Sequence, residues 1–350
     1  MHENNDEGNE MWYGIAMAFC AVGLGGFVIS RSRNETRGVC DLVGKKYIVT
    51  GANSGIGKAT VTQLVSRGAT VIMACRDLAA ATIARQDILE RAPDCEPENI
   101  RVKKLDLSSF QSIKQFAADV NVELPSLNGL INNAGMISPT YETRNGLELT
   151  MMTNYFGPFY LTTLLLPVLS KAGGAGRVVN VSSRLEKSSL LSESTIRAGP
   201  TGLLKPNEVA GYSPMSHYSD SKFCQLLATR GQAQAFKQHG IVVHAVTPGL
   251  VHTNLSRYVW LPLQYLVWPI QKLFLRTPAQ GAASVLYAAT AELPGQSTGK
   301  YWTSDKHGVC TEETGSPLSQ SLPLAAALIK NSEKLVADAV VYENSEPRSK

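Results

Sequence analysis

The sequence has few cysteines, and they do not stand in the spacings that bind metals or staple small secreted domains. Along 350 residues the six cysteines are scattered, as Cys20, Cys40, Cys75, Cys95, Cys224 and Cys310. No two of them form a CxxC pair, and no cluster of histidines accompanies them. We therefore expect reduced thiols and no metal site.

Long blocks of like charge are also missing. Charged residues make up 18% of the chain and the net charge is only +4, so the basic stripe that marks a nucleic-acid-binding protein is absent and we expect no nucleic-acid partner. Internal repeats and low-complexity tracts are absent as well. A hydrophobic content of 44% in a chain of this length fits a globular protein of one large domain or two small ones.

One long uncharged run stands near the start, in residues 11–30, "MWYGIAMAFCAVGLGGFVIS". As a helix it would be about 30 Å long, which matches the hydrocarbon core of a bilayer. A cleaved signal peptide would begin with basic residues, whereas residues 1–10 are acidic; a buried core helix is the other alternative. We predict a single-pass anchor followed by a basic linker over residues 31–44. The arginines of that linker place the rest of the chain in the cytosol. The endoplasmic reticulum is the default membrane, with mitochondria and lipid droplets as alternatives.

A strand, a glycine-rich turn and a helix follow the linker in "KKYIVTGANSGIGKATVTQLV". Apolar residues 47–49 predict the strand, and residues 61, 64 and 65 recur at helical spacing. Glycines at the turn let the backbone approach a diphosphate, which the helix N-terminus would bind with its free N–H groups. The residues expected to bind a dinucleotide here are Gly51, Asn53, Ser54, Gly55, Ile56 and Gly57.

The end of the next strand, "VIMACRD", indicates which dinucleotide is bound. An acid there would bind the ribose hydroxyls of NAD, whereas an arginine accommodates the extra phosphate of NADP. Cys75 stands at the acid position and Arg76 follows it, while Lys58 adds positive charge. We therefore predict NADP(H); the alternative is that Arg76 only pairs with Asp77 at the surface.

Further strands are predicted at residues 100–104 and in the segments "LNGLINNAG", "GRVVNVSS", "IVVHAVTPG" and "GKYWTSDK". Apolar helical segments separate most of them. The repeated βα units predict an α/β fold, a doubly wound Rossmann-type parallel sheet in a single domain. Asp106 would hold the adenine edge or cap the helix that follows, whose N-cap would be Ser108 or Ser109.

Polar residues cluster where these strands end. Tyr218 and Lys222 in "HYSDSK" are four residues apart, so on a helix they share one face. A nearby ammonium group favours a phenolate and would lower the pKa of the tyrosine from about 10. Ser183 ends the fifth strand beside Ser182, and Asn154 lies in the helix "MMTNYFGPFYLTTLLL".

Taken together, the motifs "TGANSGIG", "NNAG", "VSS", "YSDSK" and "TPGLVHT" and the Asn154 helix resemble the short-chain dehydrogenase/reductase family, over roughly residues 45–303. "GIGK", "ACRD" and the predicted anchor are similar to the membrane-anchored retinol dehydrogenase-like branch. The family's order of motifs is kept throughout.

The resemblance implies a role for each matched residue. Tyr218 would exchange a proton with the substrate oxygen, Lys222 would hold the nicotinamide ribose, and Ser183 would hydrogen-bond the substrate oxygen. Asn154 would hold a water in a proton relay. The remaining implied coenzyme contacts are Asn133 and Gly135 in the bay and Pro248, Gly249 and Thr253 at the nicotinamide end.

We place the catalytic domain at residues 45–310 and a C-terminal helix, near residues 325–335, with a tail in residues 311–350. Two segments depart from a minimal sheet: a polar insertion at 184–216 and an apolar stretch at 258–278. The second would be either core or a lid over a substrate tunnel that contacts the bilayer.

The sequence thus predicts an NADP(H)-dependent enzyme that interconverts a lipophilic alcohol and its carbonyl compound. The resemblance to the retinol dehydrogenase-like branch makes retinol and retinal the first candidates for the substrate pair. A polyprenol, a steroid or a fatty aldehyde remains an alternative substrate. A scaffold or redox sensor that binds NADP without catalysis is the non-enzyme alternative. A homodimer is compatible with the sequence.

Overall fold

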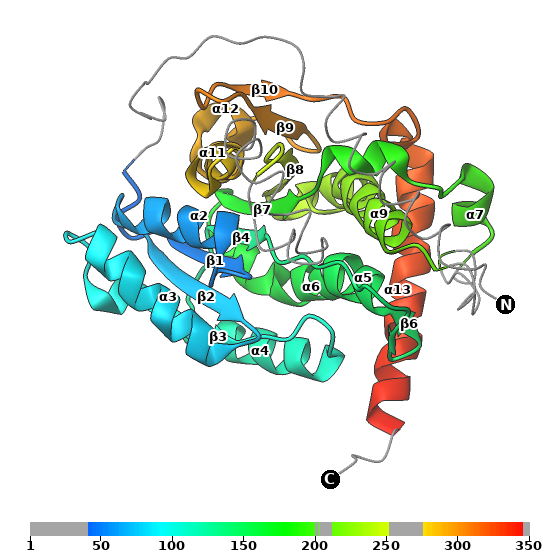
Figure 1. Ribbon diagram of the computed structural model, residues 1–350, viewed down its shortest axis with the longest axis horizontal. Coiled ribbons are helices and arrows are strands. Elements are labelled where there is room, and N and C mark those ends of the chain that lie inside the picture. Colours follow the sequence, from blue (N-terminus) through cyan, green and yellow to red (C-terminus); the bar gives the residue numbers. More distant parts are fainter. Residues whose placement is uncertain (1–40, 200–202, 204–211, 252–275, 346–350) are drawn as a thin grey trace, which may run out of the picture.

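Short runs of apolar and β-branched residues form the strands of one sheet in the computed structural model, which describes residues 41–199, 203, 212–251 and 276–345 (Figure 1). In the described part of the chain the strand order is β10-β9-β8-β7-β4-β1-β2-β3. The bounds are β1 Lys46–Thr50, β2 Thr70–Cys75, β3 Ile100–Lys104, β4 Gly129–Asn132, β7 Gly176–Val181, β8 Ile241–Thr247, β9 Tyr301–Ser304 and β10 Cys310–Glu312. A separate hairpin joins β5 Thr143–Arg144 to β6 Leu147–Glu148.

Neighbouring strands from β3 to β9 are parallel, which confirms the predicted Rossmann-type α/β fold. The expectation of a wholly parallel sheet is wrong at one edge, because β10 runs antiparallel to β9. The link from Ser304 to Cys310 is a short turn, and a turn of that length can only reverse the chain.

Helices cover both faces of the sheet. One face carries α2 Gly55–Val65, α3 Leu78–Arg91 and α11 Pro278–Thr290, and the other carries α4 Phe110–Glu123, α6 Gly157–Ser170, α9 Pro214–Ala235 and α13 Leu322–Ser345. Within β1, Ile48 packs with the second group while Tyr47 and Val49 pack with the first, as expected for a strand buried on both sides. The shorter helical segments are η1 Pro97–Asn99, α5 Leu149–Met151, the π-helix η2 Met152–Phe156, η3 Arg184–Ser188, α7 Glu193–Arg197, η5 Lys237–His239, α12 Glu292–Gly295 and η7 Leu318–Gln320.

The C-terminal helix α13 is longer than predicted and belongs to the core. It packs against α9, α7 and α4, and Leu324 and Leu328 are fully buried. The hydroxyl groups of Tyr155 and Ser332 are hydrogen-bonded at 2.7 Å, which joins α13 to η2. Ending the domain at residue 310 was therefore wrong, since both β10 and α13 complete the same packed unit.

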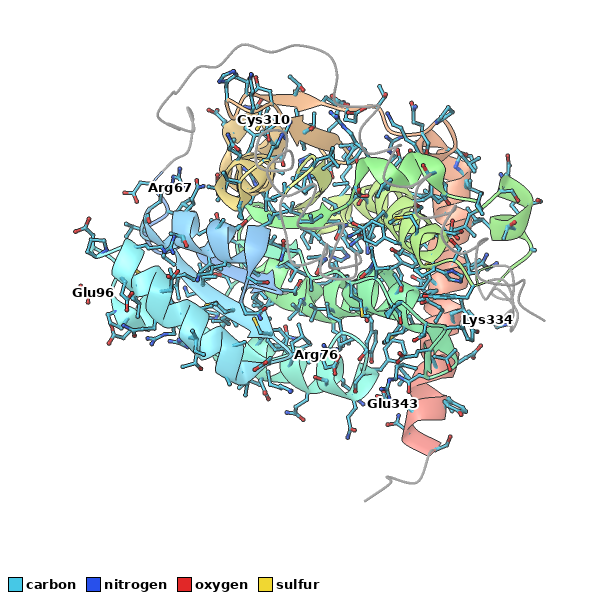
Figure 2. The ribbon with its side chains drawn as sticks, in the orientation of Figure 1. Arg67, Arg76, Glu96, Cys310, Lys334 and Glu343 are labelled. Atoms are coloured by element: carbon cyan, nitrogen blue, oxygen red, sulfur yellow. The ribbon has the colours of Figure 1, made fainter. Side chains whose placement is uncertain are left out.

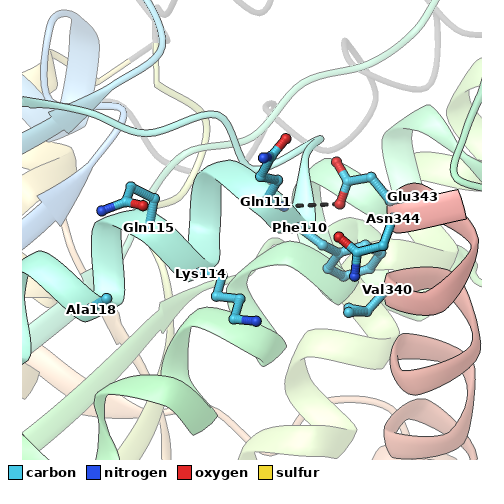
Figure 3. Close-up of a pocket in the computed structure, with 8 residues that line it drawn as sticks. All are labelled: Phe110, Gln111, Lys114, Gln115, Ala118, Val340, Glu343 and Asn344. Atoms are coloured by element: carbon cyan, nitrogen blue, oxygen red, sulfur yellow. Dashed lines mark hydrogen bonds between the residues drawn. The ribbon is translucent and has the colours of Figure 1, made fainter. Parts of the chain in front are cut away.

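Near its end, α13 borders a cavity of about 290 Å³ beside α4, shown in Figure 3. Glu343 accepts hydrogen bonds there from the backbone N–H of Gln111 (2.9 Å) and the hydroxyl of Ser109 (2.8 Å). A carboxylate at the N-terminus of α4 is favoured because the free N–H groups carry partial positive charge. This cavity lies away from the predicted catalytic residues.

Within the described ranges, no helix has the length and apolarity needed to cross a bilayer. The predicted anchor at residues 11–30 and the linker up to residue 40 lie outside those ranges. So do residues 258–275 of the predicted lid. The predicted insertion at 184–216 is described in part, and it contains η3 and α7.

The packing of α13 can be tested on the helix itself. Leu328→Ala should lower the free energy of unfolding by about 2–5 kcal/mol, because it leaves a cavity at a fully buried position. Val341→Ala, at a side chain that is 69% exposed on the same helix, should change it by less than about 0.5 kcal/mol. Urea denaturation measures both, and equal effects would mean that α13 is not part of the core.

Candidate active site

The carboxyl ends of β1, β4, β7 and β8 bring most of the predicted site residues to one edge of the sheet. Parallel strands adjacent in the order share that edge, where ligands bind in folds of this type. Gly51 follows β1, Asn133 follows β4, Ser182 and Ser183 follow β7, and Pro248 follows β8. The helix α9 supplies Tyr218 and Lys222 across the same edge.

The glycine-rich turn after β1 is closed against the turn after β4. A side chain at Gly57 would begin 2.5 Å from the carbonyl oxygen of Gly51 and 2.5 Å from the amide nitrogen of Asn133. Asn133 in turn donates to the carbonyls of Thr50 (2.8 Å) and Gly51 (3.2 Å). Gly51 and Gly55 both have positive φ angles, which favour glycine. Only glycines let these segments approach so closely.

The turn leads into an N-terminus that suits an anion. Ser54 is the N-cap of α2, and its side chain makes no cap hydrogen bond. The first turn of α2, all of it described, contains no acidic residue. Its N–H groups and the helix dipole are therefore available for a diphosphate, so the residues present fit a dinucleotide at Gly51, Asn53, Ser54, Gly55, Ile56 and Gly57.

At the end of β2, Cys75, the residue at the predicted acid position, does not face outward. It is buried, and its sulfur is hydrogen-bonded by the backbone of Ala52 and Asn53, so it supports the glycine turn from beneath. Burial raises the pKa of this thiol. The exposed residue at this point is Arg76, which lies beyond the strand end (Figure 2).

The charges around Arg76 differ in part from the prediction. Lys58 forms an ion pair with Asp87 at 2.6 Å, so its charge is already compensated by α3. Asp77 caps α3 by accepting from the N–H of Ala80. Lys104 supplies a second cation, because its ammonium group donates to the carbonyl of Arg76 at 2.6 Å. The strand end is thus basic through Arg76 and Lys104.

Asp106 stabilises the turn after β3. Its carboxylate accepts from the N–H (2.9 Å) and hydroxyl (2.6 Å) of Ser108. Of the two predicted N-caps of α4, Ser109 is the one that accepts from the helix, at the N–H of Ser112. Asp106 therefore shapes the loop at the carboxyl end of β3.

Ser183, Tyr218 and Lys222 lie together. The Ser183 side chain lies close enough to the Tyr218 phenol to lower its pKa by hydrogen bonding, and the Lys222 nitrogen is 5.6 Å from the centre of the Tyr218 ring. Lys222 donates to the carbonyl of Val181 (2.7 Å) and to the side chain of Gln225 (2.9 Å). The other serine, Ser182, is buried and donates to the backbone of Lys222, which leaves Ser183 as the serine next to the phenol.

The prediction that Lys222 lowers the pKa of Tyr218 is wrong for this structure. Burial raises the pKa of Tyr218 to about 12, against which the hydrogen bond from Ser183 acts. Burial also lowers the pKa of Lys222 to about 7. Both groups are withdrawn from water, and a low-dielectric environment disfavours the charged form of each. With a pKa of about 7 the amine is only partly charged at neutral pH, so it does not offset the effect of burial and the phenol keeps its proton.

Asn154 lies in the π-helix η2, a rare element that is frequent at functional sites. Its amide accepts from the N–H of Met136 (2.8 Å) and donates to the carbonyl of Met136 (2.9 Å) and to Ser221 (3.1 Å). A side chain at Gly135 would begin 3.5 Å from both the Asn154 oxygen and the Lys222 nitrogen. The glycine thus leaves space between these two polar groups.

The last predicted contacts follow β8. The carbonyl of Pro248 accepts from the guanidinium of Arg276 at 3.1 Å, and Gly249 adopts a positive φ of 77°. Thr253 lies outside the described residues. Sequence reasoning missed Thr50, Ser221 and Gln225, which hold Asn133, Asn154 and Lys222 respectively. Of these, only Gln225 carried a signal, because it lies one helical turn after Lys222.

Comparison with known proteins gives a consistent result. A family model described as "short chain dehydrogenase" matches residues 45–195. The human protein Retinol dehydrogenase 14 is 36% identical over 309 residues, covering 84% of this chain and 86% of its own. Human Retinol dehydrogenase 12 is 37% identical and covers 77% and 82%. A crystal structure of an uncharacterized protein from Mycobacterium Paratuberculosis has a TM-score of 0.67 at 28% identity, covering 86% and 97%.

The low pKa of Lys222 predicts a pH dependence of stability. Between about pH 7 and pH 9 the unfolded chain binds a proton at Lys222 that the folded coenzyme-free chain does not. The free energy of unfolding should therefore rise with pH over this window. Lys222→Met should make that rise smaller. Urea denaturation at a series of pH values measures it, and parallel curves for the two proteins would contradict a neutral buried amine.

Proposed function

The chain belongs to the short-chain dehydrogenase family, in its retinol dehydrogenase-like branch, and we propose that it is an NADP(H)-dependent oxidoreductase of lipophilic alcohols. It interconverts the alcohol and its carbonyl compound, with retinol and retinal as the leading pair. The observation that carries this proposal is the buried phenol of Tyr218, hydrogen-bonded to Ser183 and next to Lys222.

Tyr218 acts as the acid in carbonyl reduction. A phenol with a pKa of about 12 is protonated at neutral pH, so it holds the proton that the substrate oxygen must receive. Ser183 donates a hydrogen bond to that oxygen and fixes it at the phenol. Bound NADPH supplies the hydride. At neutral pH the free site therefore already holds the proton that carbonyl reduction consumes.

Lys222 returns a proton to Tyr218. With a pKa of about 7, its amine gains and loses a proton readily at physiological pH. The space at Gly135, bordered by Lys222 and Asn154, accommodates a water that connects the amine to solvent. Asn154 orients that water, and its own orientation is fixed by Met136 and Ser221. Lys222 also binds the nicotinamide ribose.

The coenzyme is bound by the residues at the strand ends. The turn from Gly51 to Gly57, with Asn53, Ser54, Gly55 and Ile56, binds the diphosphate, and Asn133 holds the turn in shape. Asp106 lines the adenine side, while Pro248 and Gly249 line the nicotinamide side, where the sequence motif also predicts a contact from Thr253. Arg76 binds the 2′-phosphate of NADP with Lys104 beside it, since Cys75 rather than an acid ends β2 and the following Asp77 caps α3.

The substrate is a lipophile taken from a membrane. The relatives' names, Retinol dehydrogenase 14 and Retinol dehydrogenase 12, support a retinoid. The sequence supports a membrane-bound substrate through the uncharged run at residues 11–30 and the apolar run at residues 258–278, which we propose contact the bilayer. We place the domain on the cytosolic side of the endoplasmic reticulum. A polyprenol, steroid or fatty aldehyde is the alternative substrate, and a non-catalytic scaffold is disfavoured by the complete set of Asn154, Ser183, Tyr218 and Lys222.

Tyr218→Phe tests the acid. The variant keeps the ring but loses the proton donor, so kcat for retinal reduction should fall by about 10³-fold. The affinity for NADPH should change less than about two-fold, since binding energy resides in other contacts. Turnover is measured as NADPH oxidation in liposomes with retinal, a polyprenal, a steroid ketone and a fatty aldehyde. Undiminished turnover in Tyr218→Phe would refute the assignment, and wild-type inactivity on all four would refute the proposed function.

Arg76→Ala tests the choice of coenzyme. Loss of a charged hydrogen bond of about 1.5–3 kcal/mol should weaken NADPH binding about 10- to 100-fold and leave NADH binding unchanged. Arg91→Ala, an exposed arginine paired with Asp87 on α3, is the matched control and should change neither. Titration of coenzyme fluorescence measures the affinities. Equal wild-type affinities for NADPH and NADH would contradict the preference.

A further inference from the structure

A buried carboxylate that the proposed reaction does not use lies immediately behind the active-site serine. Glu186 is in the middle of η3 and is only 1% exposed. Burial raises the pKa of its carboxyl group, while hydrogen bonds from Ser316 act in the opposite direction. Placing a carboxylate in the interior is costly unless its oxygens are satisfied, so its surroundings show what it holds.

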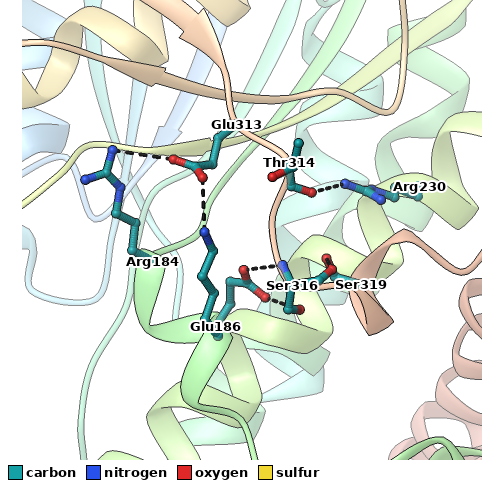
Figure 4. Close-up of polar contacts among 8 residues, drawn as sticks. Arg184, Glu186, Arg230, Glu313, Thr314, Ser316 and Ser319 are labelled. Atoms are coloured by element: carbon teal, nitrogen blue, oxygen red, sulfur yellow. Dashed lines mark hydrogen bonds and ion pairs between the residues drawn. The ribbon is translucent and has the colours of Figure 1, made fainter.

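Both oxygens of Glu186 are bound by one residue from the far end of the chain. Ser316 donates its backbone N–H at 2.8 Å and its hydroxyl at 2.6 Å, one to each oxygen (Figure 4). The preceding Gly315 has a φ of 75°, and a side chain there would begin 2.8 Å from Leu226. The hydroxyl of Ser319 donates to the Ser316 carbonyl at 2.7 Å. The segment between β10 and η7 is thus folded around this carboxylate.

Other contacts connect the same two segments, but at the surface. Glu313 pairs with Lys187 at 3.1 Å and with Arg184 at 3.4 Å, and both cations are about half exposed. Arg230 of α9 donates to the carbonyl of Thr314 at 2.9 Å (Figure 4). Exposed ion pairs contribute little because water and salt screen them. The link from Glu186 to Ser316 in the middle of η3 is therefore expected to fix its position together with buried Asp220, which accepts from Ser189 and Leu190 at the end of η3.

The position of η3 decides where Ser183 points. Ser183 is the N-cap of η3, and its side-chain oxygen accepts from the N–H of Leu185 at 3.2 Å. The same side chain is hydrogen-bonded to Tyr218. A displacement of η3 would therefore carry the Ser183 hydroxyl away from the phenol, although no atom of Glu186 takes part in the reaction.

We propose that Glu186 is a positioning residue that acts through Ser183: bound to Ser316, it holds η3 so that the Ser183 hydroxyl faces Tyr218 and the substrate oxygen. This inference rests on the proposed oxidoreductase function. It gives the segment after β10 a role in the active site, since residue 316 lies 133 positions after residue 183 in the chain.

Two variants separate the hydrogen bonds from the charge. Glu186→Ala removes both bonds and should lower kcat about 10- to 100-fold, because small displacements of a reacting group are costly, while NADPH affinity changes less than about two-fold. Glu186→Gln should restore kcat to within about three-fold of wild type. Its amide oxygen can accept from the Ser316 N–H while its amide nitrogen donates to the Ser316 hydroxyl.

A double-mutant cycle shows whether the effect passes through Ser183. In a Ser183→Ala background, Glu186→Ala should lower kcat less than about three-fold further, because the group it positions is gone. A purely structural role would give the full loss in both backgrounds. Glu193→Ala is the matched control: this exposed glutamate of α7 pairs with Arg197 in a contact of the i, i+4 type, and it should leave kcat unchanged.

The experiment is steady-state NADPH oxidation with the full-length protein in liposomes and the best substrate of the panel, with coenzyme affinity and thermal unfolding measured in parallel. If Glu186→Ala does not fold, Ser316→Ala removes one of the two bonds and should show a smaller loss with the same non-additivity. Unchanged kcat in these variants, additive losses in the cycle, or failure of Glu186→Gln to restore kcat would overturn the inference alone. Inactive wild-type protein would overturn the proposed function and this inference with it.

Discussion

The withdrawal of α9 from water is the constraint on which the site depends. From His217 to Thr229 every side chain of this helix is buried, and that stretch includes a lysine, an aspartate, a glutamine and a tyrosine. Leaving a buried polar group without any partner is costly, because water cannot reach it. Lys222 donates to the Val181 carbonyl and to Gln225, and Ser183 interacts with the Tyr218 phenol. Asp220 accepts from Ser189 and Leu190. These interactions hold the polar side chains of α9 in the positions that form the active site.

Burial also sets the chemistry. A solvent-exposed tyrosine and lysine four residues apart would be a neutral phenol and an ammonium ion at neutral pH. In the interior the phenol holds its proton more firmly, and the amine gives its proton up near neutrality. Desolvation outweighs the attraction that the spacing alone suggests, because both groups lose their hydration while the cation that would favour a phenolate is itself suppressed. The site is thereby prepared to deliver a proton.

Residues in the C-terminal part of the chain fix the positions of segments that lie next to the active site. Ser316 binds Glu186 behind Ser183, Ser332 binds Tyr155 next to Asn154, and Glu343 caps α4 beside the Asp106 loop. Three elements that contain or adjoin predicted site residues are thus fastened by contacts from the last thirty residues of the described chain, 316–345. Each of these contacts joins residues more than a hundred positions apart in the sequence.

The sequence by itself determined the strands, the glycine turn and the identity of the phenol and amine, because period-two and helical patterns, glycines and i, i+4 spacing are local signals. Only the tertiary structure decided which serine lies next to Tyr218 and that Lys58 is paired with Asp87. It also decided that Cys75 supports the glycine turn and that β10 runs antiparallel at the edge of the sheet. It alone also decided the charge states of Tyr218 and Lys222. Burial and long-range partners fix these properties, and neither is written in the spacing of neighbouring residues.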